Sequence, residues 1–534
     1  MKCRLMLFAV AAATCANAAA NADQSLWDLA RNNADTLTVS TLFTAQQVRD
    51  HLGTDKGIDD AIDWCRRTAV TRVFIETFRD NYTARRETLE HAKKRFLDAG
   101  FAVSGCVTTT LVGKRSTGWN PISCYTDVPT QDRLQEIFEY TASIFDEIMI
   151  DDFLFTDCEC DACKAARGSR GWSDYRCDLM VNVSRQRILA AARAVNPKVS
   201  IIIKYPQWYD NFHQRGYEVL RQTADFDTTW VGTETRDYDD PRWGGKVQYE
   251  AYYIMRWLGE IGGPKCGGGW FDWLGTTEYT YLEQACQTIL ADAKEMMLFC
   301  YGGLLSSTGP ANVARLRKEM PALFELARLV RNKPIRGIAA PKPPNSDAGK
   351  EAYVYDFVGM LGLPLVPTAE LNPQAQAAFC PVHILKDPRY AEKLNAMLKA
   401  ERPVLITDGL AARITGVNLD DPFLTVLKVN GSPKSLLSLT REQINPIRNR
   451  LLAPLGLAFD APNKTGLYLF ADDLIVIENF NDEPIDVALT LPKPAKAQVV
   501  LTIPQDRKTD LTVADRTLNL KLSPRTLAAI KCPQ

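Results

Sequence analysis

The sequence lacks an excess of positive charge. Its 63 Lys and Arg residues are balanced by 64 Asp and Glu residues, which gives a formal net charge of −1. Proteins that bind nucleic acids through phosphate groups usually carry a basic surface and a high isoelectric point. The charge balance therefore argues against a nucleic-acid partner and indicates a substrate that is neutral or only locally charged.

Long apolar runs are also scarce. Beyond the N-terminus, no stretch has the roughly 18 uninterrupted apolar residues that a membrane span needs. The N-terminus has the layout of a secretory signal peptide, because Lys2 and Arg4 precede the apolar run 5–13 and small residues follow. We expect residues 1–22 to be removed from an exported, periplasmic or extracellular protein. Losing these two bases changes the net charge from −1 to −3.

No internal repeat is present, and no Gly-rich phosphate-binding turn follows the first predicted strand, which disfavours a doubly wound nucleotide-binding sheet. What the sequence does contain is a regular alternation of strand and helix patterns. Strands are predicted at 38–43, 71–76, 102–108, 147–152, 200–205, 228–234, 266–270 and 297–301. Helices are predicted at 85–99, 131–145, 174–195, 245–259, 280–296 and 311–330. This rhythm predicts an α/β fold, a (β/α)8 TIM barrel over residues 23–333.

Polar and aromatic residues gather at the ends of the predicted strands. Asp151 and Asp152 end the fourth strand, and in a TIM barrel such side chains converge on one mouth. Carboxylates bind sugar hydroxyls, and tryptophan rings stack on the apolar face of a pyranose. The other candidates follow strands two, five, six and seven: Glu76, Lys204, Trp208, Glu234, Arg236, Trp270, Asp272 and Trp273. Together they predict a site for an oligosaccharide or glycan.

Hydrolysis of a glycosidic bond usually needs two carboxyl groups. Asp152 and Glu234 are the preferred catalytic pair, because strand ends four and six face each other across part of the barrel. Three alternatives stay open. Asp151 and Asp152 could work as neighbours in a substrate-assisted hydrolase of the hexosaminidase type, or the mouth could belong to a carbohydrate-binding pseudoenzyme. A lyase acting on uronic sugars would use Lys204 or Tyr205 as its base.

A cysteine cluster follows the fourth strand. Cys158, Cys160 and Cys163 lie within six residues, which is too close for all of them to pair well as disulfides but suits one tetrahedral metal ion. Cys124, in the loop after the third strand, is the preferred fourth ligand, and Cys177 is the alternative. Four thiolates predict a closed structural Zn²⁺ site that joins two loops at the mouth. Disulfides are the alternative in an oxidising compartment.

Two further units are predicted after the barrel. Residues 334–433 begin with a Pro-rich turn or linker at 340–345 and continue with helices at 351–361 and 390–400 and strands at 364–367, 378–381 and 404–407. This pattern predicts a small flavodoxin-like domain with a core thiol at Cys380. Residues 434–534 show short strands at 466–470, 473–479, 485–490, 497–501, 517–522 and 526–530, which predict a β-sandwich.

The cysteine spacing, the strand-end Ile150-Asp151 before it and the order of the three units resemble the family 42 glycoside hydrolases, which are β-galactosidases with a zinc cluster and a trimerisation domain. The resemblance covers nearly the whole chain after residue 22. It implies a glycoside hydrolase with zinc at the four cysteines, and a homotrimer. The family carries Asn-Glu at the end of strand four, where this chain has Asp152-Phe153, and a Glu nucleophile on strand seven, where it has Asp272.

Acids on strands four and six are also similar in placement to those of the α-galactosidase clan. That resemblance implies that Asp152 attacks the anomeric carbon and that Glu234 donates the proton.

Overall fold

The computed structural model describes residues 25–471 and 473–532, so the predicted signal peptide lies outside the described residues. Eight parallel strands form a closed barrel, and β1 pairs with both β2 and β9 to complete the ring. These strands are β1 (Thr38–Phe43), β2 (Arg72–Arg79), β4 (Ala102–Val107), β5 (Glu147–Ile150), β6 (Ser200–Tyr205), β7 (Thr228–Gly232), β8 (Cys266–Asp272) and β9 (Glu295–Phe299). The short β3 (Tyr82–Thr83) forms a hairpin with β2. The predicted TIM barrel is confirmed.

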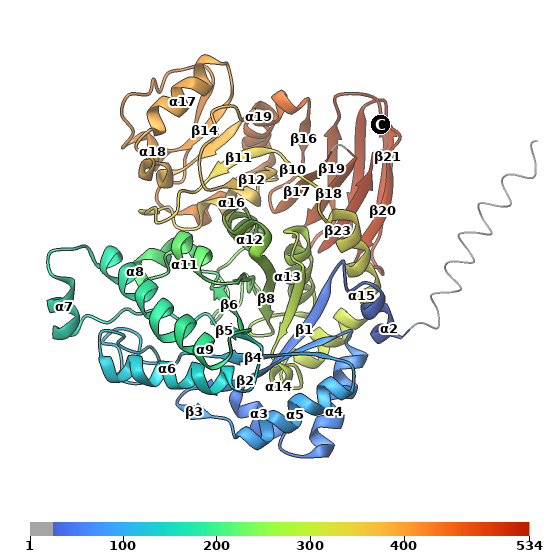
Figure 1. The fold of residues 1–534 in the computed structure, drawn as a ribbon. Helices are drawn as coiled ribbons and strands as arrows, with labels where there is room; N and C mark the ends of the chain where they lie inside the picture. The colour runs from blue at the N-terminus through green and yellow to red at the C-terminus, as the bar shows by residue number, and fades with distance from the viewer. Residues whose placement is uncertain (1–24, 472, 533–534) are drawn as a thin grey trace, which may run out of the picture.

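Helices surround the barrel, as Figure 1 shows. The helices are α2 (Leu26–Asn32), α3 (Ala45–His51), α4 (Asp55–Arg67), α5 (Arg86–Asp98), α6 (Val128–Ala142), α7 (Asp161–Arg167), α8 (Trp172–Val183), α9 (Ala190–Val195), α10 (Phe212–Arg215), α11 (Val219–Asp225), α12 (Tyr249–Gly262), α13 (Glu278–Leu290), α14 (Tyr301–Leu304) and α15 (Gly309–Val330). A π-helical stretch, Ser184–Leu189, joins α8 to α9, so the predicted helix 174–195 is one continuous rod. In the described part of the chain, no helix combines the length and apolar character needed to cross a membrane.

Several predicted boundaries were wrong. The helix expected at 280–296 ends at Leu290, because Asp292 has a positive φ of 69° that turns the chain toward β9. Strand β9 accordingly starts at Glu295, two residues before the predicted start. The helix expected to start at Gly245 starts at Tyr249, and the residues before it belong to the long loop after β7.

The barrel interior is filled with side chains. Phe74, Met149, Trp230 and Trp270 pack there together with other apolar residues. Gly267 and Gly268 of β8 make room for the Trp230 indole, since a Cβ added at Gly267 would lie 2.7 Å from its Nε1 and one added at Gly268 would lie 2.9 Å from its ring. The barrel is therefore a packed core, and its chemistry must lie at one end.

A second, parallel sheet follows. Its order is β12 (Leu365–Thr368), β11 (Ile338–Pro341), β13 (Ala378–Cys380), β14 (Val404–Thr407) and β15 (Leu424–Leu427), with α16 (Val354–Gly359), α17 (Tyr390–Lys399) and α18 (Asp408–Ala411). This 2-1-3-4-5 order is that of flavodoxin-like sheets, as predicted. The linker predicted at 340–345 was wrong at its start, because Ala340 and Pro341 are the last two residues of β11. Proline has no backbone N–H to donate to a neighbouring strand, and the end of a strand tolerates this loss.

The C-terminal region packs two antiparallel sheets. One has the order β10 (Ile335–Arg336), β17 (Thr465–Phe470), β18 (Leu474–Asn479), β23 (Thr526–Lys531) and β20 (Gln498–Ile503). The other has the order β16 (Ala458–Asp460), β19 (Ile485–Thr490), β22 (Thr517–Leu522) and β21 (Thr509–Ala514). The region also contains α19 (Arg441–Leu452), which the prediction missed although Thr440 and Gln443 form a capping box at its start.

Glu283 of α13 links the barrel to the C-terminal sheets through a buried charge. Its carboxylate accepts a hydrogen bond from Gln248 Nε2 at 3.0 Å and lies 3.4 Å from Nη1 of Arg525. Burial raises the pKa of Glu283 to about 7, although Arg525 and Gln248 act in the opposite direction. An unfolded chain would titrate this carboxyl near pH 4.3.

We expect Glu283→Gln to flatten the pH dependence of the free energy of unfolding between about pH 4.3 and 7. In this window the folded protein holds a proton that the unfolded chain has lost, so the stabilisation is complete below pH 4.3 and disappears as the pH rises through 7. The free energy of unfolding should change by about 4 kcal/mol across this window. Denaturant unfolding at pH 4.5 and 7.5 measures it. Asp482→Asn, which removes an exposed partner of Arg525, is the control; the same pH dependence in wild type and Glu283→Gln would contradict the assignment.

Candidate active site

Asp151 and Asp152 come directly after β5, at the carboxyl end of the barrel. The backbone N–H of Asp151 still bonds to Val107 of the neighbouring strand, which fixes the chain at this point. The Asp151 side chain is 2% exposed, whereas that of Asp152 is 14% exposed. The Asp151 side chain is therefore buried beneath the mouth of the barrel, whereas the Asp152 side chain is partly accessible from it.

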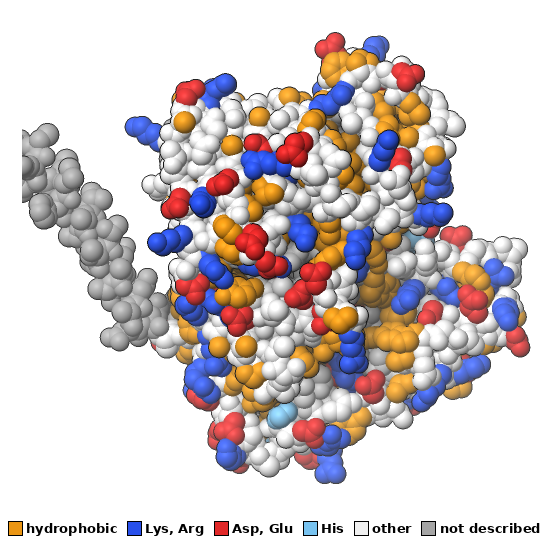
Figure 2. Space-filling view, turned by 180° about the vertical axis from the view of Figure 1, so that it is seen from behind, with side chains coloured by type: hydrophobic (Ala, Val, Ile, Leu, Met, Phe, Trp, Pro, Cys, Tyr) orange, Lys and Arg blue, Asp and Glu red, His pale blue; other side chains and the backbone are white. Residues whose placement is uncertain are grey.

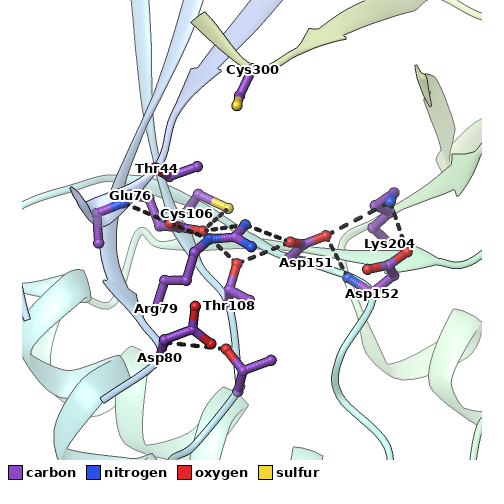
Figure 3. Close-up of polar contacts among 12 residues, drawn as sticks. Thr44, Glu76, Arg79, Asp80, Cys106, Thr108, Asp151, Asp152, Lys204 and Cys300 are labelled. Atoms are coloured by element: carbon purple, nitrogen blue, oxygen red, sulfur yellow. Dashed lines mark hydrogen bonds and ion pairs between the residues drawn. The ribbon is translucent and has the colours of Figure 1, made fainter. Parts of the chain in front are cut away.

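A buried network holds Asp151 in place (Figure 3). Its Oδ2 accepts hydrogen bonds from Arg79 Nη2 at 2.8 Å and from Thr108 Oγ1 at 3.0 Å, and its Oδ1 accepts the backbone N–H of Asp152 at 2.7 Å. Arg79 also pairs through Nε and Nη2 with Glu76, whose carboxylate additionally accepts the N–H of Ala45. Every oxygen of Glu76 and Asp151 thus has a donor from the protein.

Lys204 of β6 contacts three acids that follow its two neighbouring strands, β5 and β7. Its Nζ lies 2.8 Å from Glu234 Oε1, 3.1 Å from Asp152 Oδ2 and 3.7 Å from Asp151 Oδ1. The same atom lies 4.1 Å from the centre of the Trp270 ring, which forms the floor below it. Burial opposes the charge on Lys204, but the three acids raise its pKa above the usual value.

The two neighbouring aspartates have pKa values displaced in opposite directions. For Asp151, burial alone would raise the pKa, but Lys204 and Arg79 outweigh it and lower the value. For Asp152, burial and the charges of Asp151 and Glu234 raise the pKa to about 8 against the effect of Lys204. Pairs of acids whose environments separate their pKa values are typical of acid–base catalysis.

Glu234 lies two residues after the end of β7. Its Oε1 bonds to Lys204, whereas its Oε2 is buried and has no hydrogen-bond partner among the described residues. A Cβ added at Gly232 would come within 2.4 Å of this Oε2. The glycine is therefore what allows the Glu234 carboxylate to occupy its position, with one oxygen free.

The structure brings Asp151, Asp152, Glu234, Lys204 and Glu76 into one network. The second strand was expected to end at Glu76 but continues to Arg79, so Glu76 lies inside β2. Arg236 and Asp272 form a separate pair beside them, with Arg236 Nε and Nη2 at 3.0 and 2.6 Å from the two Asp272 oxygens.

The three predicted tryptophans occupy different positions. Trp270 is 2% exposed and stacks on Phe299 inside the barrel. Trp273 and Trp208 are partly exposed, and Trp208 packs edge-on against Phe155 with ring centres 5.1 Å apart.

Sequence reasoning left several mouth residues out of the site. Arg79 connects Glu76 to Asp151, and its position three residues after Glu76 was the available signal. Trp119, in the loop after β4, is 47% exposed, and its ring lies 5.7 Å from that of Phe153. Cys300, at the end of β9, accepts a hydrogen bond from Gln47 Nε2 at 3.0 Å and points toward the network from the opposite side of the mouth (Figure 3).

The four predicted cysteine ligands come together. Cys124, Cys158, Cys160 and Cys163 have their sulfur atoms within 4.8 Å of one another. The Sγ–Sγ distances from Cys163 to Cys124 and Cys160 are 3.5 and 3.6 Å, and Cys124 and Cys160 are 3.9 Å apart. All are free thiols. The alternative ligand, Cys177, lies apart from them, with its sulfur against the carbonyl oxygen of His213. This cluster could hold a metal ion.

A closed parallel barrel with an acid-lined mouth is the architecture of many glycoside hydrolases. The sequence profile described as "Probable glycosyl hydrolase, catalytic domain" matches residues 24–351, more than half of the chain. The chain therefore belongs to this glycosyl hydrolase family, and the expectation of a glycoside hydrolase is confirmed.

One curated relative and two solved structures extend the comparison. An uncharacterized protein of Saccharolobus solfataricus is 25% identical over 355 residues, which are 60% of this chain and 58% of that protein, so this chain spans less than two thirds of its relative's length. α-L-Fucosidase isoenzyme 2 from Paenibacillus thiaminolyticus has a TM-score of 0.58 at 11% identity, covering 93% of this chain and 99% of that one. Gan42B, a GH42 β-galactosidase from G. stearothermophilus, has a TM-score of 0.57 at 10% identity, covering 94% and 98%. The predicted family 42-like architecture is thus confirmed at the level of fold.

Proposed function

We propose that the protein hydrolyses an O-glycosidic bond of an oligosaccharide or glycan with retention of configuration, using Asp152 and Glu234 as its two carboxyl groups. The observation that carries this proposal is the Lys204 ammonium between them. The nearest oxygens of the two acids are 3.1 and 2.8 Å from Nζ. These two oxygens can therefore be no more than about 6 Å apart. Such a short approach favours retention, since retaining enzymes hold their carboxyl groups about 5–5.5 Å apart and inverting enzymes about 6.5–9.5 Å apart.

The electrostatics favour roles opposite to those implied by the α-galactosidase clan. Because the pKa of Asp152 is raised to about 8, this group carries a proton at neutral pH and can donate it to the leaving oxygen. Glu234 is paired with Lys204 and keeps its buried Oε2 free of any protein donor. Asp152 is thus the general acid, and Glu234 is the nucleophile.

The same contacts account for the second half of the reaction. Attack by Glu234 on the anomeric carbon forms an ester and breaks the bond to the leaving oxygen, which takes the proton of Asp152. The ester has no negative charge, so one of the causes that raise the pKa of Asp152 disappears. Asp152 is then a carboxylate that accepts a proton from the incoming water as the ester is hydrolysed.

The remaining polar residues support this pair. The carboxylates of Glu76 and Asp151 have their hydrogen bonds supplied by the protein, in part by Arg79. We therefore assign these three residues to fixing the backbone of Asp152 and maintaining the charges around its side chain. Arg236 and Asp272 form a bidentate ion pair beside Glu234. The hydrogen-bonding positions that this pair leaves unused can bind hydroxyls of the sugar. The buried Trp270 supports Lys204 from below.

Two alternatives are less well supported. A substrate-assisted mechanism would need a free carboxylate on Asp151 to orient an acetamido group, but both its oxygens already accept protein hydrogen bonds. A carbohydrate-binding pseudoenzyme has no use for one protonated acid beside one ionised acid, since clustered buried acids are costly.

Turnover of a panel of aryl α- and β-glycosides tests the proposal. NMR of the first product formed should show the sugar released with the configuration of the substrate. Release of the opposite anomer would exclude the mechanism, and binding of glycans without any turnover would favour the pseudoenzyme.

The cysteine cluster fits a structural zinc ion. A tetrahedron with Zn–S distances of about 2.3 Å has S–S edges of about 3.8 Å, and the sulfur distances of 3.5, 3.6 and 3.9 Å lie around this value. Four thiolates leave no open coordination position, so the ion would contribute stability and not a catalytic water. It would tie the loop after β4, which carries Cys124, to the loop after β5.

We expect one zinc ion per chain in the purified protein, measured by inductively coupled plasma mass spectrometry. Cys160→Ser should lose most of this zinc and unfold at a lower temperature, because removing a ligand from a closed site removes its folding free energy. Cys266→Ser is the matched control, since Cys266 is equally half-buried but lies outside the cluster. Undiminished zinc content in Cys160→Ser would contradict the assignment.

We also propose that the chain is exported after cleavage near residue 22 and that it forms a homotrimer through the flavodoxin-like sheet, as family 42 resemblance implies. The mass of the N-terminal peptide from the native host and light scattering of the purified protein test these two points.

A further inference from the structure

We propose that Trp119 and Phe153 form the binding site for the leaving-group sugar, so that the enzyme cleaves a bond between two sugar units. This inference rests on the proposed function. It concerns aromatic residues on the loops after β4 and β5 that sequence reasoning did not include in the site.

Trp119 is a large apolar side chain in an exposed position, with 47% of its surface accessible. Its ring lies parallel to that of Phe155, at 10° and 6.2 Å, and tilted by 34° to that of Phe153 at 5.7 Å. Phe155 is buried, whereas Phe153 is partly exposed. The Trp119 ring therefore packs against both phenylalanine rings and still keeps 47% of its surface accessible.

The loop that carries Trp119 is anchored. The backbone N–H of Trp119 bonds to Asp157 Oδ2 at 2.8 Å, and Ser116 Oγ bonds to Asp157 Oδ1. A Cβ added at Gly118 would lie 2.5 Å from the Asp157 carboxyl carbon, so only glycine permits this close approach. An exposed tryptophan held in a fixed orientation binds a ligand without a large loss of side-chain entropy.

The order of the barrel strands places these rings on the leaving-group side. The strands run β4, β5, β6, β7 around the barrel. The loop after β4 carries Trp119, the loop after β5 carries Asp152 and Phe153, β6 itself carries Lys204, and the loop after β7 carries Glu234. In this order, the acid that protonates the leaving oxygen lies between Trp119 and the nucleophile. A ligand group that contacts Phe153, directly after Asp152, is the group attached to that oxygen.

The chemistry of this surface fits a sugar. Aromatic faces bind the C–H face of a pyranose, and the hydroxyl edges of the sugar stay in water or meet polar side chains. On the face seen in Figure 2, hydrophobic side chains gather in a hollow beside the lobe that carries α7. An alcohol without a ring would leave the Trp119 face uncovered.

The test compares two substrates of the sugar that the aryl glycoside panel identifies. One is its glycosyl fluoride, whose leaving group is too small to reach the rings, and the other is a disaccharide with the same sugar at the cleaved end. Trp119→Ala should lower kcat/KM for the disaccharide about tenfold, mainly through KM, and leave the fluoride unchanged. Trp119→Phe should restore much of the loss, and Trp27→Ala, on distant α2, should affect neither substrate.

An equal loss on both substrates would place Trp119 at the cleaved sugar and overturn the proposal, as would no loss on the disaccharide. If the wild type turns over neither substrate, the proposed hydrolysis fails, and the binding site is judged by fluorescence. Quenching of tryptophan emission by the disaccharides lactose, cellobiose and maltose should then be present in the wild type and weaker in Trp119→Ala. Equal quenching in both would overturn it.

Discussion

Glu234→Gln lowers kcat by about 10⁴-fold on every glycoside that the enzyme accepts, which corresponds to about 5 kcal/mol of lost transition-state stabilisation. The amide cannot form the ester intermediate, so even a substrate with an excellent leaving group is not rescued. Stopped assays over long times with a dinitrophenyl glycoside measure the residual rate. Circular dichroism and thermal unfolding establish that the variant is folded, which we expect because Gln keeps an acceptor for Lys204.

Azide distinguishes the role of Glu234 from that of a supporting acid. In Glu234→Ala, azide can occupy the space of the carboxylate, attack the anomeric carbon directly and give a glycosyl azide of inverted configuration. A retained azide product, or normal turnover in Glu234→Gln, would show that another residue is the nucleophile. Asp272→Asn is a useful comparison, because Asp272 lies nearby but is held in a bidentate pair with Arg236.

Asp152→Asn has an effect that depends on the leaving group. A disaccharide needs its leaving oxygen protonated, so its kcat/KM should fall by about 10²–10⁴-fold, the usual contribution of a general acid. A dinitrophenyl glycoside needs no proton for bond cleavage, so its kcat/KM should change little. Steady-state kinetics on the two substrates measure this difference.

The role of Asp152 as general acid also predicts the direction in which kcat/KM changes with pH. Burial, Asp151 and Glu234 raise the pKa of Asp152 to about 8, so the acid is protonated below this pH. Loss of this proton should lower the kcat/KM of the wild type for the disaccharide as the pH rises through 8. Asp152→Asn should lack this alkaline decline. A decline at the same pH in the variant, or equal losses on both substrates, would assign the acid to another group.

The barrel and the cysteine cluster could be predicted because their signals are local. Each barrel strand is a short apolar run bounded by turn residues, and Cys158, Cys160 and Cys163 are near neighbours in the chain. The boundaries at Leu290 and Tyr249 could not, since they depend on the positive φ of Asp292 and on a loop that packs only in the folded protein.

The chemistry of the site could be predicted only in part. Strand ends gave the position of Asp152 and Glu234, but their separate roles depend on Lys204 and Asp151, which converge only in three dimensions. Arg79 bonds to Asp151 across 72 residues of sequence. Trp270 lies near the end of β8, but its side chain points inside the barrel. Most of β8 is buried on both faces, so its sequence has no alternation of polar and apolar residues that could predict which way the side chain points.

Trapping the covalent intermediate tests the central claim, that Glu234 attacks the sugar while Asp152 supplies the proton. The protein is incubated with an activated 2-deoxy-2-fluoro glycoside of the accepted sugar, digested and examined by tandem mass spectrometry. We expect one fluorosugar per chain, bound through an ester to Glu234. A label on Asp152, Asp151 or Asp272, or turnover of the natural substrate without any label, would contradict the account.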